Sequence, residues 1–183
     1  MRMRSMLLVG FGLAMAFVVP AAAEVMVGGA PMYPTRNIIQ NAVHSKVHTT
    51  LVSAVKEAGL VETLEGPGPF TVFAPTNRAF EKLPNGTVAS LMEPSNKYQL
   101  KNILTYHVLS GRYTTRDLMD KIQASGGRAT INTVEGQPLA FTERGGRIFV
   151  TDAKGDTAAI TIANVMQSNG VIQVVDSVLL PNG

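Results

Sequence analysis

The sequence contains no cysteine. This absence excludes disulfide scaffolds, cysteine-ligated zinc sites, iron–sulfur clusters and thiol nucleophiles. Charged residues make up only 16% of the 183 positions, so the chain is not, in the main, a solvated disordered tail. A hydrophobic content of 45% at this length suits one domain of ordinary size, or two small ones.

A strong excess of one charge is also missing. The formal net charge is +3, but Arg2 and Arg4 lie in a segment that has the pattern of a cleaved leader. Without them the chain carries 14 basic and 13 acidic side chains. The sequence pI of about 9.3 therefore owes much to the leader, and we expect no nucleic-acid partner.

The first 23 residues have the three parts of a signal peptide. A short basic segment, 1–5, precedes an uncharged apolar run, 6–19, and Pro20 then leads into the small residues Ala21–Ala23. The apolar run is shorter than the ~20 residues that span a bilayer. The last residues, 179–183, carry no anchoring signal. We expect cleavage after Ala23 and a mature protein that is exported, periplasmic or secreted, and not membrane-embedded.

The mature chain begins with a segment rich in turn-forming residues. Residues 24–34 contain Gly28-Gly29, Pro31 and Pro34, which favours an extended or flexible lead-in. From 35 to about 124 the hydrophobic period is helical. One apolar stripe predicts a helix that Gly59 ends, and its members are Leu51, Val52, Val55 and Ala58.

A second helix is predicted after Pro94, with Ser95 as its N-cap. Its buried face consists of Leu100, Ile103, Leu104 and then His107 or Val108. From Gly126 onward the period changes to two, and turn residues recur every 8 to 12 positions. The predicted strands are 129–134, 139–142, 148–151, 158–165 and 171–180, with Asn169-Gly170 as a hairpin signal. Helices followed by strands without a linker predict a single α+β domain.

No catalytic constellation is found. The sequence has no Gly-x-Ser-x-Gly elbow, P-loop or glycine-rich dinucleotide turn. His44 and His48 have the spacing of two zinc ligands, but the glutamate of a zincin is absent. The carboxylates are scattered singly, without a pair suited to acid–base chemistry. We expect a protein that is not an enzyme and has no cofactor.

The dipeptide Tyr106-His107 is one candidate binding feature. Together with an aliphatic collar it predicts a partner-binding surface, because tyrosine is favoured at interaction hot spots. The candidate residues are Ile103, Leu104, Tyr106, His107, Val108 and Leu109. In the competing interpretation, His107 lies on the apolar stripe and donates a hydrogen bond to an acceptor in the core.

A second candidate is a copper site near the mature N-terminus. Thioether and imidazole groups suit copper, and the chain offers Met26, Met32, His44 and His48 there. The alternative places both methionines on a flexible lead-in and both histidines at a solvated helix end. A periplasmic copper-handling protein is therefore the second hypothesis of function.

Three segments in order share one resemblance: residues 70–80 (FTVFAPTNRAF), Tyr106-His107 and residues 169–181 (NGVIQVVDSVLLP). Together they resemble the fasciclin domain, a module of extracellular adhesion proteins and of small secreted bacterial proteins. The first segment resembles the first signature block of that family, Tyr106-His107 its central motif and the last segment its second block. The resemblance runs from about Thr35 to Pro181, so a fasciclin domain is expected over 35–181.

The resemblance implies a wedge of two β-sheets, with about seven strands, and several helices packed to one side. It gives the two blocks a structural role, which falls on Phe70, Val72, Phe73, Ala74, Pro75, Thr76, Asn77, Phe80, Asn169, Gly170, Val174, Asp176 and Leu179. It also implies that His107 hydrogen-bonds near Thr76 or Asn77. That role for His107 leaves Tyr106 as the better residue for partner contact.

The function implied by the resemblance is adhesion or association with surfaces or extracellular matrix. In animal members the tyrosine–histidine region is implicated in integrin binding. We expect the corresponding surface of this chain to contact a partner, but we do not expect that partner to be an integrin. The expected partner is an unidentified surface or extracellular protein or polysaccharide. The protein itself is expected to be a monomer or to self-associate weakly.

Overall fold

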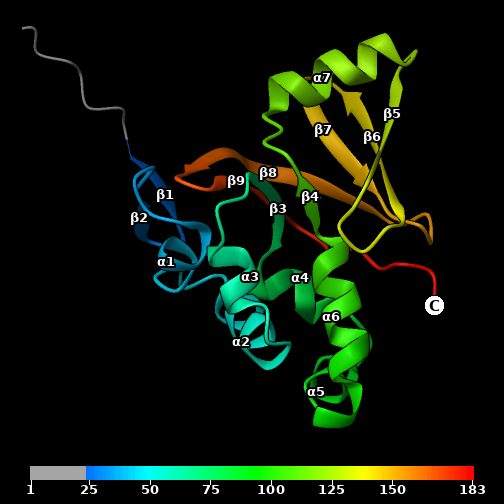
Figure 1. Cartoon of the computed structure of the whole chain (residues 1–183). Coiled ribbons are helices and arrows are strands. Elements are labelled where there is room, and N and C mark those ends of the chain that lie inside the picture. Colours follow the sequence, from blue (N-terminus) through cyan, green and yellow to red (C-terminus); the bar gives the residue numbers. More distant parts are fainter. Residues whose placement is uncertain (1–23) are drawn as a thin grey trace, which may run out of the picture.

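A computed structural model describes residues 24–183 (Figure 1), so the predicted signal peptide lies outside the described residues. The helices are α1 (Ile38–Ala42), α2 (Thr49–Glu57), α3 (Val61–Glu65), α4 (Asn77–Glu81), α5 (Thr87–Leu91), the 3-10 turn η1 (Pro94–Asn96), α6 (Lys97–Tyr106) and α7 (Thr115–Ala124). The strands are β1 (Val25–Val27), β2 (Ala30–Met32), β3 (Phe70–Pro75), β4 (Val108–Ser110), β5 (Arg128–Asn132), β6 (Pro138–Arg144), β7 (Arg147–Thr151), β8 (Thr157–Gln167) and β9 (Gly170–Val175).

Seven strands form one strongly bent sheet in the order β4-β3-β9-β8-β7-β6-β5. The long strand β8 joins the two halves, because residues 157–159 pair with β7 and residues 160–167 pair with β9 through two bulges. Beyond β5, the amide of Val134 donates to the carbonyl of Val108 in β4, 2.8 Å away. The two ends of the sheet therefore meet, and the sheet is nearly closed. The α+β prediction is confirmed, although the seven strands are continuous and the second sheet is the small β1-β2 hairpin.

Two hydrophobic cores lie on opposite faces of β3 and β9. Val72 and Ala74 of β3 point into a core covered by α1 to α6, which we name the helix-side core. Phe73 points the other way, into a core enclosed by the curved sheet and α7, which we name the barrel core. Figure 1 shows α7 beside β5, β6 and β7, with α2 to α6 grouped at the other end. Burial on both faces explains why these strands are hydrophobic without alternation.

The segment expected to be a flexible lead-in is instead folded. Strands β1 and β2 pair in antiparallel register, and Val27 and Met32 are buried in the helix-side core. Gly28 and Gly29 form the two-residue turn with φ values of 60° and 78°, as a type I′ hairpin requires. The extended backbone expected for 24–34 is present, but as a paired hairpin packed on the core, because a Gly-Gly turn between two short apolar runs is itself a hairpin signal.

The predicted buried faces of two helices are confirmed, but one predicted N-cap is wrong. The stripe over 51–58 forms α2, and Gly59 follows it with φ of 70°. Leu100, Ile103 and Leu104 are the buried face of α6, as predicted. Ser95 is not an N-cap, however, because it lies within η1 and α6 starts at Lys97 without a side-chain cap.

The second signature block is only partly a strand. Strand β9 covers 170–175, and residues 176–180 continue as an irregular segment in which Val178 and Leu179 are buried. The predicted strand over 171–180 is therefore too long. Gly170 pairs directly beside Phe70, and a Cβ at this glycine would collide with the Phe70 carbonyl oxygen. Close approach of the two backbones explains the glycine.

Candidate functional site

The Tyr106-His107 motif lies in the interior of the domain. Tyr106 is 0% exposed, and the other five residues of the expected binding surface are also buried, namely Ile103, Leu104, His107, Val108 and Leu109. The expectation that Tyr106 is available on the surface for partner contact is therefore wrong. Tyr106 ends α6 and points into the barrel core, because its ring packs there and its hydroxyl finds two backbone partners.

The Tyr106 hydroxyl connects three parts of the chain. It donates to the carbonyl of Pro138 at 2.9 Å and accepts from the amide of Ala153 at 2.9 Å. Burial raises the pKa of Tyr106 to about 12, so the phenol is neutral at ordinary pH. The hydroxyl thus holds β6 and the loop after β7 against the end of α6.

His107 fastens the second signature block. Its Nδ1 lies 2.8 Å from the carbonyl of Ile103, and its Nε2 accepts from the amide of Leu179 at 2.9 Å. A carbonyl can only accept, so Nδ1 carries the proton and the ring is neutral. Burial lowers the pKa of His107 to about 4, which keeps it neutral near neutral pH.

The expected hydrogen bond from the His107 side chain to Thr76 or Asn77 is wrong. Contact with the first block is made by the backbone instead, where the His107 carbonyl accepts from the amide of Phe73 at 2.9 Å. The interpretation that His107 satisfies a core acceptor holds, with Ile103 as that acceptor.

Three further side chains hold the irregular segment 176–183. Lys82 donates to the carbonyl of Asp176 at 2.6 Å, and Asp152 accepts from the amide of Leu180 at 2.9 Å. The Gln137 side chain bonds Asn182 in both directions. Together with His107 these contacts form a clamp on the C-terminal segment, since that segment has no strand partner of its own in the described chain.

The polar residues of the two blocks have structural partners. The Thr76 hydroxyl caps α4 by accepting from the amide of Ala79. The Asn77 side chain donates to the carbonyl of Lys46, before α2, and accepts from the amide of Thr50 in the first turn of α2. Asn169 accepts from the amide of Ile38 and donates to two carbonyls at the end of α3.

The two blocks also meet at an open groove of about 740 Å³, which we name the block groove. Its walls come from the β1-β2 turn, the segment before α2, α4 with its flanking residues, the middle of β8 and the end of β9. Thr76 and Arg78 come from the first block, while Val174 and Asp176 come from the second. Arg78 is exposed, whereas the Lys82 amine is engaged by the clamp. The groove offers hydrogen-bonding and charged groups above an apolar floor of Ile162 and Val174.

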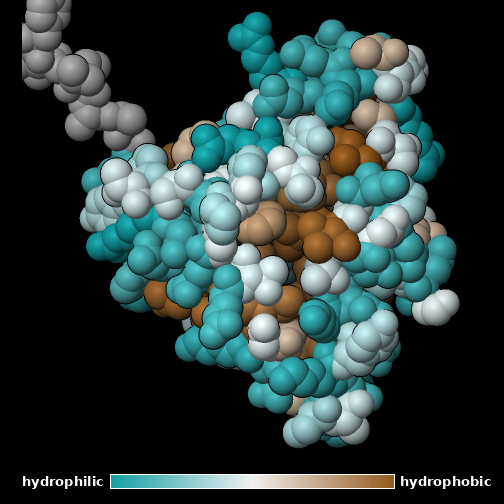
Figure 2. Space-filling view, viewed as in Figure 1, coloured by the Kyte–Doolittle hydropathy of each residue, from teal (hydrophilic) through white to brown (hydrophobic). Residues whose placement is uncertain are grey.

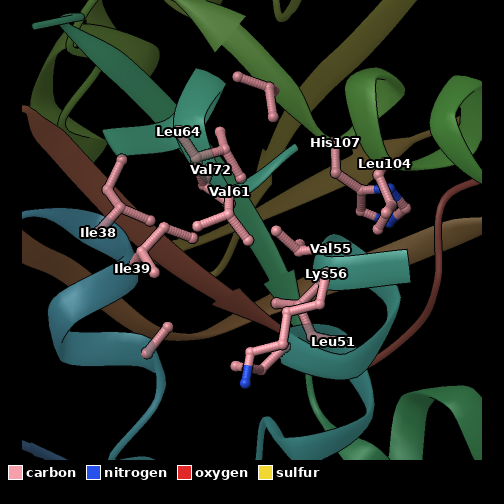
Figure 3. Close-up of a pocket in the computed structure, with 13 residues that line it drawn as sticks. Ile38, Ile39, Leu51, Val55, Lys56, Val61, Leu64, Val72, Leu104 and His107 are labelled. Atoms are coloured by element: carbon pink, nitrogen blue, oxygen red, sulfur yellow. The ribbon is translucent and has the colours of Figure 1, made fainter. Parts of the chain in front are cut away.

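A second concavity is almost wholly apolar, and we name it the apolar cleft. It lies between α1, α2, α3, β3 and the junction of α6 with β4, and it encloses about 30 Å³. Figure 2 shows hydrophobic surface in the middle of one face, over the region of α3, β3 and β4. In Figure 3, Ile38 and Ile39 lie on one side of this cleft, Leu104 and His107 on the opposite side, with Val61 between them.

The residues of the copper hypothesis do not converge. Met26 is 56% exposed on the hairpin, and His44 lies in a surface hollow with Arg36 and Gln40. Met32 and His48 line one small interior cavity, but both His48 nitrogens have hydrogen-bond partners, Ser45 and Ala74. Within residues 24–183 no group of three or more histidine or acidic side chains is placed to hold a metal ion. No helix in the same range is long and apolar enough to cross a membrane.

A profile of the Fasciclin domain matches residues 46–181. Protein sll1483 of Synechocystis sp. is 41% identical over 179 residues, which cover 95% of this chain and 92% of that protein. Immunogenic protein MPB70 of Mycobacterium bovis is 31% identical, with coverage of 92% and 89%. Human periostin is 32% identical over 71% of this chain and 14% of its own length.

A solved structure has the same fold. It is a FAS1 domain pair from the insect cell adhesion molecule Fasciclin I, with a TM-score of 0.71 and 22% sequence identity. The match covers 79% of this chain and 51% of that one, so the chain spans about half of the solved pair. At this identity the likeness concerns the fold alone.

Proposed function

Because this chain belongs to the Fasciclin domain family, we propose that it is an exported, non-enzymatic interaction module that mediates adhesion or surface association. The observation that carries the proposal is the profile match over residues 46–181. A protein of the same fold, the insect molecule Fasciclin I, is a cell adhesion molecule. Export is supported by the signal-peptide pattern of residues 1–23.

The block groove is the contact surface in this proposal. Residues of both signature blocks line it, and its volume of about 740 Å³ suits an extended segment of protein or polysaccharide. Arg78 and Glu81 on its rim are exposed and offer charged hydrogen bonds, while Thr161 adds a hydroxyl. The partner is a surface or extracellular protein or polysaccharide.

Tyr106 and His107 are positioning residues in this account. His107 holds Leu179, three residues after Asp176, and Asp176 lines the groove while its carboxylate accepts from the amide of Ala159. Loss of either motif side chain would disturb the groove indirectly, through the segment that the clamp holds. A binding defect in such a variant is therefore expected to accompany a loss of stability.

Beads coated with residues 24–183 test the proposal against isolated cell-envelope fragments of the source cells. Arg78→Glu changes an exposed rim residue, and Arg147→Glu is the matched control on β7, away from the groove. Melting temperatures establish that all three proteins are folded. We expect fragments to be retained by the wild type and the control but lost with Arg78→Glu. Equal retention by both variants would move the contact surface elsewhere, and no retention by the wild type would contradict the proposed function.

A further inference from the structure

The apolar cleft is a site separate from the block groove, and no lining residue is common to both. Its walls are aliphatic side chains, among them Ile38, Val55 and Leu64. His107 also lines it, but both of its ring nitrogens are occupied by Ile103 and Leu179. Apart from the Lys56 amine at one end, the cleft therefore offers no free polar atom to a sugar or a peptide, and its interior suits an apolar guest.

A second apolar cavity of about 30 Å³ adjoins the first. The two share four wall residues, Ile38, Ala42, Leu51 and Val72, so only side chains separate them. The polar groups of the second cavity belong to Ser45 and His48, and these bond each other and the Ala74 carbonyl. The two cavities together make an elongated apolar space between α1 and α2 on one side and β3 on the other.

A single cationic side chain is found among the residues that line the cleft. Lys56 is exposed, and Figure 3 shows it beside Leu51 and Val55 at one end. Its nearest acidic neighbours in sequence, Glu57 and Glu62, do not line the cleft. An aliphatic interior with a cation at its mouth is complementary to an aliphatic chain that ends in an anion.

The apolar cleft is narrow in this structure, and two of the helices that line it, α1 and α3, are short. Helices α1 and α3 have five residues each, fewer than an isolated helix needs for stability in water. Ile39 on α1 and Val61 on α3 are only half-buried at the cleft. Displacement of these short helices would join the two cavities, with loss of the hydrogen bonds by which Asn169 holds Ile38 of α1 and the end of α3.

We propose that the apolar cleft binds the chain of a free fatty acid, with the aliphatic tail between α1 and β3 and the carboxylate at Lys56. Binding opens the space between the two cavities, and the ligand replaces contacts that α1 makes in the empty domain. This activity goes beyond the proposed adhesion function and does not depend on it.

The test uses residues 24–183 and dodecanoate below its micelle concentration, with dodecanol as the uncharged probe, measured by calorimetric titration. Lys56→Ala is expected to weaken dodecanoate about two- to fivefold, as loss of an exposed ion pair does, and to leave dodecanol unchanged. Val61→Gln is expected to weaken both probes about tenfold or more by placing an amide in the apolar wall. The matched control Lys101→Ala, an exposed lysine of α6, changes neither.

Saturable binding of dodecanoate with one site per chain and this pattern of variants supports the proposal. Absence of saturable binding, or equal affinities in the wild type and Val61→Gln, would overturn the site. Equal loss of both probes in Lys56→Ala would overturn the role of the carboxylate. Phosphatidylglycerol vesicles are the competing occupant, and binding to vesicles without binding to dodecanoate would also overturn it.

Discussion

The barrel core and the helix-side core lie on opposite faces of the same two strands, β3 and β9, but differ in packing. The barrel core contains the largest fully buried side chains, with the Phe73 and Phe141 rings 5.6 Å apart and the Tyr106 hydroxyl bonded on both sides. The helix-side core is covered mainly by short helices and contains two apolar cavities of about 30 Å³ each. The barrel core therefore supplies rigidity, and the helix-side core has room to change.

Matched leucine truncations should show the largest contrast. Leu118 of α7 is fully buried in the barrel core, whereas Leu51 of α2 lines both cavities. Leu118→Ala is expected to lower the free energy of unfolding by about 4 kcal/mol, and Leu51→Ala by about 2 kcal/mol, because a leucine beside existing voids loses fewer contacts. Urea denaturation of both variants measures the difference. Equal losses of unfolding free energy in the two variants would contradict the difference in packing between the two cores.

The pH dependence of stability should report on His107, at the boundary of the two cores. Its pKa is about 4 when folded, and an unfolded histidine titrates near 6.5. Stability is therefore complete above the unfolded pKa and falls as the pH drops from about 6.5 to about 4, by about 3 kcal/mol in total. Urea titrations across this range measure the loss.

His107→Gln is the control for that titration. The variant lacks the titrating group, so its stability should fall less steeply over the same range, with the remaining slope owed in part to His48. Burial also lowers the pKa of His48 and gives its contribution the same sign. A variant with the same slope as the wild type would show that His107 is not the group responsible.

Small-to-large substitutions should show the same contrast between the two cores, with a smaller effect on stability. Ala42 lines both cavities, and Ala158 is fully buried in the barrel core. Ala158→Val is expected to destabilise the domain by about 1–3 kcal/mol through overpacking. Ala42→Val is expected to change stability by less than about 1 kcal/mol, or to raise it, because the added methyl groups enter a void. Melting temperatures of the two variants measure the difference. A lower melting temperature for Ala42→Val than for Ala158→Val would contradict the placement of the voids in the helix-side core.

The helix ends and turns that depend on neighbouring residues could be predicted from the sequence. Gly59 ends α2, as its position after the apolar stripe predicts. The hairpin signal near Asn169 correctly joins β8 to β9, although the turn itself consists of Ser168 and Asn169 because Gly170 already pairs with Gln167. Such features depend on residues within a few positions of each other.

The structural roles of Tyr106 and His107 could not be predicted from the sequence, because their hydrogen-bond partners are distant in the chain. The Tyr106 hydroxyl is satisfied by Pro138 and Ala153, 32 and 47 residues away, and the partner of His107 is Leu179, 72 residues away. A tyrosine on an apolar helix stripe could have been assigned to the core from its spacing, but no local signal names its partners. The two cavities follow from the tertiary packing of short helices, which sequence patterns do not specify.

Native-state hydrogen exchange of two amides tests the central contrast most directly. The Ile38 amide, bonded to Asn169, belongs to the helix-side core, and the Leu179 amide, bonded to His107, belongs to the clamp on the barrel core. We predict that Leu179 exchanges only through global unfolding, while Ile38 exchanges through a local opening of α1 at a clearly lower free energy. Equal opening free energies at the two amides, or a lower value at Leu179, would contradict the account.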